Sequence, residues 1–117
     1  SRFLQRLQDT PEPTGNGTML DNTVTLFGSA SSAFHLSRNY PIVLTGGSNL
    51  GFKHGQYLKF GTDEDNSSSS GISSDTGWKS NLKDEERPLS DLYLTMLQCL
   101  GVETDSFGGS ETTVSEA

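Results

Sequence analysis

The sequence predicts an α/β fold that is incomplete on its own, and three observations support this prediction. Two short runs, at 23–27 and 41–45, are rich in β-branched and apolar residues and predict strands. An amphipathic stretch near 90–100 predicts a helix that covers them. Hydrophobic residues make up only 31% of the chain, and its 13 glycines bring the apolar total only to the edge of the roughly 45–50% usual in globular domains. We therefore expect residues 1–117 to be a segment of a larger α/β domain.

The first half of the chain predicts a short helix followed by the two strands. Apolar residues at helical spacing predict the last turns of a helix over 1–8, and the prolines that follow end it. The first strand stops at Gly28. The run Ile42-Val43-Leu44 in the second strand does not alternate with polar residues. It predicts a strand covered on both faces, as in a parallel or mixed sheet.

The stretch after the second strand predicts a turn, a third strand and an insertion. Glycines within 46–51 predict a sharp turn, since their spacing fits neither a dinucleotide-binding nor a phosphate-binding loop. Residues 56–60 alternate well enough for a short strand nearer the edge of the sheet. Residues 61–87 are acidic and serine-rich, so we expect a mobile surface insertion, with Trp78 as its one anchor or as part of a lid.

The clearest predicted element is the helix near 90–100. Ser90 is the expected N-cap, and Gly101 is placed for a left-handed C-cap. Beyond it the chain turns polar and acidic. Phe107 is the last expected anchor, and residues 108–117 are expected to form a flexible tail.

The overall charge excludes some classes of partner. The formal net charge of −7, with scattered Lys and Arg, argues against nucleic acid, whose phosphates require a basic face. No apolar run approaches the roughly 20 residues of a membrane span, so none is expected. The single cysteine excludes an internal disulfide and a cysteine-based zinc cluster.

His35, in the loop between the two strands, is the candidate metal ligand. A lone loop histidine is more often a solvated or hydrogen-bonded side chain than a ligand. To hold a metal it needs two or three further His, Asp or Glu side chains at the same point, and its near neighbours are serines and Asn39. His54 is expected to be an exposed turn residue. No catalytic residue is assigned.

Several short motifs, in a fixed order, resemble the C-terminal part of the HXXSHH-motif proteins, a bacterial family of unknown function. The motifs are Arg2-Phe3, Gly17-Thr18-Met19-Leu20-Asp21-Asn22-Thr23, Phe27-Gly28-Ser29, His35, Asn39-Tyr40-Pro41-Ile42-Val43-Leu44-Thr45-Gly46-Gly47, Gly55-Gln56-Tyr57-Leu58-Lys59-Phe60, Pro88-Leu89-Ser90-Asp91-Leu92-Tyr93-Leu94 and Leu100-Gly101-Val102-Glu103-Thr104-Asp105-Ser106-Phe107-Gly108. Their order and spacing carry the resemblance, which covers most of the chain except the insertion at 61–87 and the last few residues.

The resemblance implies a fold and a cellular location. The family is similar to the alkaline phosphatase and sulfatase fold, so this chain would be the C-terminal portion of such a sheet, and its members are usually exported, to the periplasm or cell surface. The family's namesake signature lies upstream of this region and is absent here, which favours a fragment. His35 matches the first histidine of the family's loop, whereas Ser37 stands where a second would be and the acidic residue is missing.

Two functions follow from the resemblance and the missing ligands. The first is an exported, non-catalytic structural or binding module, held to the remainder of its own polypeptide or to another protein chain. The alternative is the C-terminal part of a metal-dependent phosphate- or sulfate-ester hydrolase. In that case His35 would be one ligand of a divalent metal such as zinc or calcium, which polarises the ester and activates an oxygen nucleophile.

Overall fold

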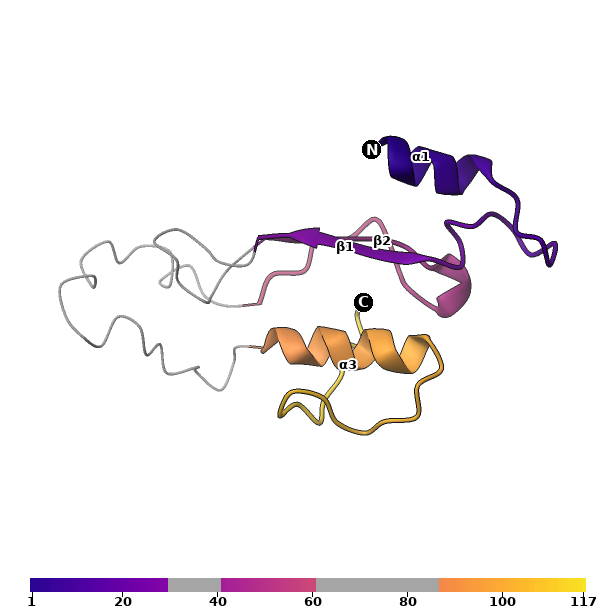
Figure 1. Ribbon diagram of the computed structural model, residues 1–117. Helices are drawn as coiled ribbons and strands as arrows, with labels where there is room; N and C mark the ends of the chain where they lie inside the picture. The colour runs from indigo at the N-terminus through magenta and orange to yellow at the C-terminus, as the bar shows by residue number, and fades with distance from the viewer. Residues whose placement is uncertain (30–40, 61–86) are drawn as a thin grey trace, which may run out of the picture.

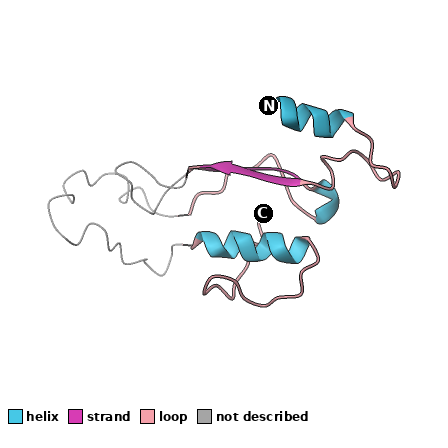
Figure 2. Cartoon of the chain, in the orientation of Figure 1, coloured by secondary structure: helices cyan, strands magenta, loops and turns pink. Residues whose placement is uncertain are grey.

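A computed structural model of the protein describes residues 1–29, 41–60 and 87–117 (Figure 1). These residues form a small mixed α/β domain with two α-helices, a short 3-10 helix and a two-stranded antiparallel sheet (Figure 2). His35 and the predicted insertion, apart from its last residue, Arg87, lie outside the described residues. The α/β class predicted from the sequence is confirmed at this level.

The N-terminal helix, α1, spans Arg2–Asp9 and confirms the helix predicted there. The Ser1 hydroxyl caps it by accepting a hydrogen bond from the Leu4 amide at 3.4 Å. No residue of α1 is buried, and Phe3 is 61% exposed. One link to the body is the hydrogen bond from the Leu20 amide to the Leu7 carbonyl, at 3.2 Å. Phe3 is therefore largely uncovered by the described residues, whereas Leu4 and Leu7 are half-buried.

The sheet consists of β1, Val24–Gly28, and β2, Ile42–Gly46, close to the predicted positions. The strands are antiparallel, which excludes a purely parallel sheet, whereas the mixed sheet also predicted stays a prediction. Gly28 pairs with Ile42, and the connecting segment therefore joins adjacent strand ends as a hairpin, without the crossover that parallel strands require. The other half of that expectation, cover on both faces, also fails within the described residues, because Val43 is 53% exposed.

The third predicted strand, 56–60, is not a strand in the structure. Gly55 turns the backbone at φ 78°, and the Gln56 side chain then donates to the carbonyls of Lys53 and Glu116. Tyr57 is left 87% exposed. Alternating side chains form a strand only when a neighbouring edge supplies hydrogen bonds, and no described strand pairs with this segment.

A sharp turn follows β2, as the glycines predicted. Gly46 and Gly47 have φ of 77° and 73°, and the 3-10 helix η2, Ser48–Leu50, comes directly after them. A Cβ on Gly46 would lie 2.1 Å from the Thr23 carbonyl oxygen. The turn therefore requires glycine for two reasons, the left-handed backbone and the close approach of Thr23, the residue before β1.

The second α-helix, α3, spans Leu89–Cys99 and confirms the predicted helix. Its N-cap is Pro88, so the prediction of Ser90 is wrong: the helical backbone already begins at Leu89, after the fixed φ of the proline. The C-terminal prediction is confirmed. Gly101 has φ 83°, its amide donates to the Gln98 carbonyl, and the next amide donates to a carbonyl one turn back, which is a Schellman motif.

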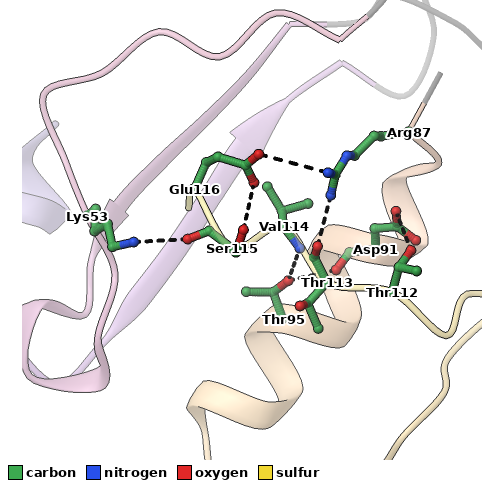
Figure 3. Close-up of polar contacts among 9 residues, drawn as sticks. All are labelled: Lys53, Arg87, Asp91, Thr95, Thr112, Thr113, Val114, Ser115 and Glu116. Atoms are coloured by element: carbon green, nitrogen blue, oxygen red, sulfur yellow. Dashed lines mark hydrogen bonds and ion pairs between the residues drawn. The ribbon is translucent and has the colours of Figure 1, made fainter. Parts of the chain in front are cut away.

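The C-terminal residues differ most from the prediction. Residues 108–117 were expected to be a flexible tail, with Phe107 as the last anchor. Instead Val114 is only 4% exposed, and the segment around it is hydrogen-bonded both to α3 and to the residues after β2 (Figure 3). The expectation fails because one valine in a polar stretch has no periodicity to reveal its burial. Val114, Phe52 and Leu94 are the buried hydrophobic residues of the described part of the chain.

Candidate functional site

A connected group of polar contacts lies where residues 112–117, called here the C-terminal segment, pass α3 (Figure 3). The Val114 amide donates to the Thr95 hydroxyl at 2.8 Å, and that hydroxyl donates to the Asp91 carbonyl at 2.8 Å. The Thr112 hydroxyl donates to Asp91 Oδ2 at 3.0 Å. Thr95 and Asp91 are one helical turn apart, so both face the same strip of the segment. Side chains of α3 thus satisfy backbone and hydroxyl groups that the segment could not satisfy within itself.

Arg87 and Lys53 hold the same segment from two further directions. Arg87 Nη1 donates to the Thr113 carbonyl at 2.9 Å, and Arg87 Nη2 lies 3.8 Å from Glu116 Oε1. Lys53 Nζ donates to the Ser115 carbonyl at 2.9 Å (Figure 3). These side chains connect α3 to the residues after β2 through the segment between them.

The segment's charge interactions also act on the Glu116 carboxyl. Its own backbone amide lowers the pKa of Glu116 below the usual 4.5, with smaller contributions from Arg87, Ser115 and Lys53, while partial desolvation raises it. Both side chains of the Arg87–Glu116 pair are solvent-exposed, so the pair contributes little to stability. The pair places the Glu116 carboxylate beside the Arg87 guanidinium and so partly offsets its positive charge.

Asp91 is the unusual residue of the site. Its side chain is only 3% exposed, and no described residue donates a hydrogen bond to Oδ1. Asp91 is the third residue of α3, a position from which a carboxylate usually reaches back to the N–H of the N-cap residue. Here the N-cap is Pro88, which has no N–H. A buried oxygen left without a donor costs about 1–3 kcal/mol, so Asp91 requires an explanation.

An open depression of about 600 Å³ lies beside Asp91, between the start of α3 and the loop that precedes the C-terminal segment. Its lining includes Arg87, Pro88, Asp91, Ser110, Glu111 and Thr112. The Ser110 hydroxyl is already hydrogen-bonded to Ser90, and the Thr112 hydroxyl to Asp91. Asp91 and Glu111 therefore supply the available negative charge in the lining.

A second polar cluster surrounds Asp21 at the other end of the domain. Its carboxylate accepts hydrogen bonds from the Ser48 hydroxyl at 2.6 Å and from the Thr18 amide and hydroxyl, both at 2.8 Å. These donors lower the pKa of Asp21 below the usual 3.8, the Ser48 hydroxyl contributing most. The carboxylate ties the loop before β1 to η2, so its role is structural.

The sheet presents a third feature, a pair of exposed apolar side chains on one face. Phe27 of β1 lies directly opposite Val43 of β2, so their side chains share a face. They are 79% and 53% exposed. The opposite face carries Val24, Leu26, Ile42 and Leu44, all half-buried. The face with Phe27 and Val43 also carries Thr25 and Thr45, which are half-buried, so among the described residues it is open only at the end where Phe27 and Val43 lie.

The structure tests part of the histidine prediction. His35 lies outside the described residues, so its role as a metal ligand stays a prediction. His54 is exposed, as predicted, but it lies in irregular backbone before the bend at Gly55 rather than in a turn, and its Nε2 donates to the Gly46 carbonyl at 2.7 Å. Within residues 1–29, 41–60 and 87–117 no three His, Cys, Asp or Glu side chains are grouped closely enough to hold a metal ion.

Over the same ranges no helix combines the length and hydropathy that crossing a bilayer requires.

Sequence reasoning missed Asp91 as a site residue. With Ser90 as the expected N-cap, the sequence does not place Asp91 at the third helical position; only the observed N-cap, Pro88, leaves its carboxylate there without an N–H to bind. Its burial was not predictable, because it depends on the fold of residues 108–117.

Comparisons with known proteins add no family to these observations. No protein-family model matches the chain. No curated protein and no solved structure matches it either.

Proposed function

We propose that the chain is an exported, non-catalytic structural or binding module that packs against further polypeptide through the sheet face that carries Phe27 and Val43. The observation that carries this proposal is the pair Phe27 and Val43, side by side on a regular strand pair and both more than half exposed. Such adjacent apolar side chains on a sheet face are typical of surfaces that another layer covers.

The size of the sheet supports the same proposal. Two antiparallel strands are marginally stable on their own, and independent sheets usually have three or more. Within the described residues each of β1 and β2 has one edge without a strand partner. Further polypeptide could therefore add a strand as well as cover the face. Whether that polypeptide is the remainder of the same protein or a separate chain, the chemistry of the contact is the same.

The export and the ancestry of this module rest on the resemblance to the HXXSHH-motif proteins. On the same basis a second candidate is the C-terminal part of a metal-dependent phosphate- or sulfate-ester hydrolase. The observation in its favour is the match of His35 to the first histidine of that family's loop. Zinc or calcium content, measured in the purified protein and in His35→Ala, separates the two candidates. Metal that is bound by the parent protein and lost on substitution supports the hydrolase.

Site-specific photo-crosslinking tests the module proposal. A photoreactive phenylalanine analogue replaces Phe27 in one variant and Val43 in another, in cells that make the full-length protein. A matched control places it at Phe107, an apolar residue that is 45% exposed but lies beyond α3. We expect positions 27 and 43 to crosslink to the same polypeptide segment and position 107 not to do so. Equal crosslinking from all three positions, or none from 27 and 43, would reject the proposal.

A further inference from the structure

We infer that the depression at the start of α3 binds a basic side chain, lysine or arginine, of the polypeptide on which the module packs. The inference rests on the proposed function, because it specifies one contact of that partner. It starts from Asp91, a carboxylate that is 97% buried and has one oxygen without a donor among the described residues. An ionised carboxylate is acceptor-only, so what it lacks is a hydrogen-bond donor.

The free oxygen is close to the depression but closed to solvent. Asp91 lines the depression, and Oδ1 exposes less than 1 Å². Rotation of the carboxylate only exchanges its two equivalent oxygens, so the position without a donor stays buried. Gly108 and Gly109, with φ of 58° and 85°, lie in the adjoining loop. A ligand that enters the depression therefore reaches the Asp91 carboxylate only when this loop shifts.

The charges around the depression select a cationic donor. Asp91 and Glu111 are negative, and Arg87 is the one positive side chain in the lining. The Arg87 guanidinium is already engaged by the Thr113 carbonyl and by Glu116. The lining therefore carries an excess of negative charge, within a chain whose net charge is −7. A positively charged donor gains a charge-assisted hydrogen bond here, whereas an anion would meet two carboxylates.

The same residues favour an organic cation over a metal ion. A structural metal site needs three or more ligating side chains, and the described residues contain no such group. Two carboxylates and the apolar ring of Pro88 suit instead the charged head and apolar stem of lysine or arginine. The volume of about 600 Å³ accommodates one such side chain with the backbone that carries it.

Binding of short peptides to the isotope-labelled full chain tests this inference. The probe is acetyl-Gly-Lys-Gly-amide, and its control contains norleucine, which keeps the apolar stem and removes the charge. We expect the lysine peptide to shift the NMR resonances of the Asp91 carboxylate and of the Ser110 and Thr112 amides in a saturable way. The norleucine peptide should shift them at least tenfold less at equal concentration.

Matched variants connect the effect to the two carboxylates. Asp91→Asn should weaken lysine-peptide binding at least tenfold, and Glu111→Gln about threefold, whereas Glu103→Gln, exposed just beyond α3, should leave it unchanged. Glu111 is exposed, so its variant keeps the inference testable if Asp91→Asn does not fold.

Three outcomes would overturn the inference: equal shifts from the lysine and norleucine peptides, unaltered binding in both the Asp91 and Glu111 variants, or saturation by calcium alone at lower concentration than by the peptide. The tripeptides are too short to cover the sheet face as well. Their failure would therefore remove the basic-side-chain site without affecting the crosslinking test of Phe27 and Val43.

Discussion

Substituting Leu94 with alanine should remove the principal anchor of α3. Leu94 is the one fully buried side chain of the described residues, with 0% exposure. Leucine to alanine removes three carbons, which at about 0.8 kcal/mol per buried methylene lose roughly 2.4 kcal/mol of transfer free energy. The cavity that remains adds to this loss, and buried Leu→Ala substitutions span about 2–5 kcal/mol. We expect about 3 kcal/mol here, because a short helix held on one side by a single segment can partly collapse into the space.

The appropriate assay is urea unfolding followed by far-UV circular dichroism, which reports directly on helix content. The control is Leu100→Ala, the same chemical change at the end of the same helix, where the side chain is 52% exposed. Its expected loss is below about 1 kcal/mol, since more than half of the side chain is already in water. If both variants lose the same free energy of unfolding, Leu94 is not the anchor and the packing described for α3 is wrong.

Two further predictions concern the other end of the domain. The pKa of Asp21 is lowered in the folded state, so its contribution to stability is present above the unfolded value, about 3.8, and is lost as the pH falls through the folded value. In thermal unfolding, the stability difference between the parent protein and Asp21→Asn should therefore shrink as the pH drops below 3.8, and a difference that stays constant with pH would contradict this. Gly46→Ala should destabilise the protein by more than the roughly 1–2 kcal/mol of a left-handed backbone, because its Cβ meets a carbonyl at 2.1 Å. Gly51→Ala, at φ 95° with open space around the Cβ, should lose only the free energy that a left-handed backbone costs alanine. Equal losses of unfolding free energy in the two variants, measured in urea, would argue against the close approach of Gly46 to the Thr23 carbonyl.

Local patterns in the sequence predicted most of the elements. The helical spacing of the apolar residues located α1 and α3, and β-branched runs located β1 and β2, each within a residue or two of its observed bounds. The Gly101 C-cap and the glycine turn after β2 were also predicted, because both depend on the backbone freedom of single residues.

Features that depend on distant residues were not predicted. The strand direction depends on which ends the 29–41 connection brings together, and the apolar run at 42–44 carries no information about that. Residues 56–60 alternate like a strand, but no described strand offers them an edge. Asp91 escaped notice because its burial depends on residues some 20 positions further along the chain.

The position of the C-terminal segment has a consequence for synthesis of the protein. Lys53 binds the Ser115 and Ala117 carbonyls, across 62 and 64 positions of sequence, and α3 reaches the residues after β2 largely through that segment. While residues 112–117 are still inside the ribosomal exit tunnel, the nascent hairpin and α3 lack the hydrogen bonds through which this segment connects them. We therefore expect folding of this domain during synthesis to be completed only after residues 112–117 have left the tunnel.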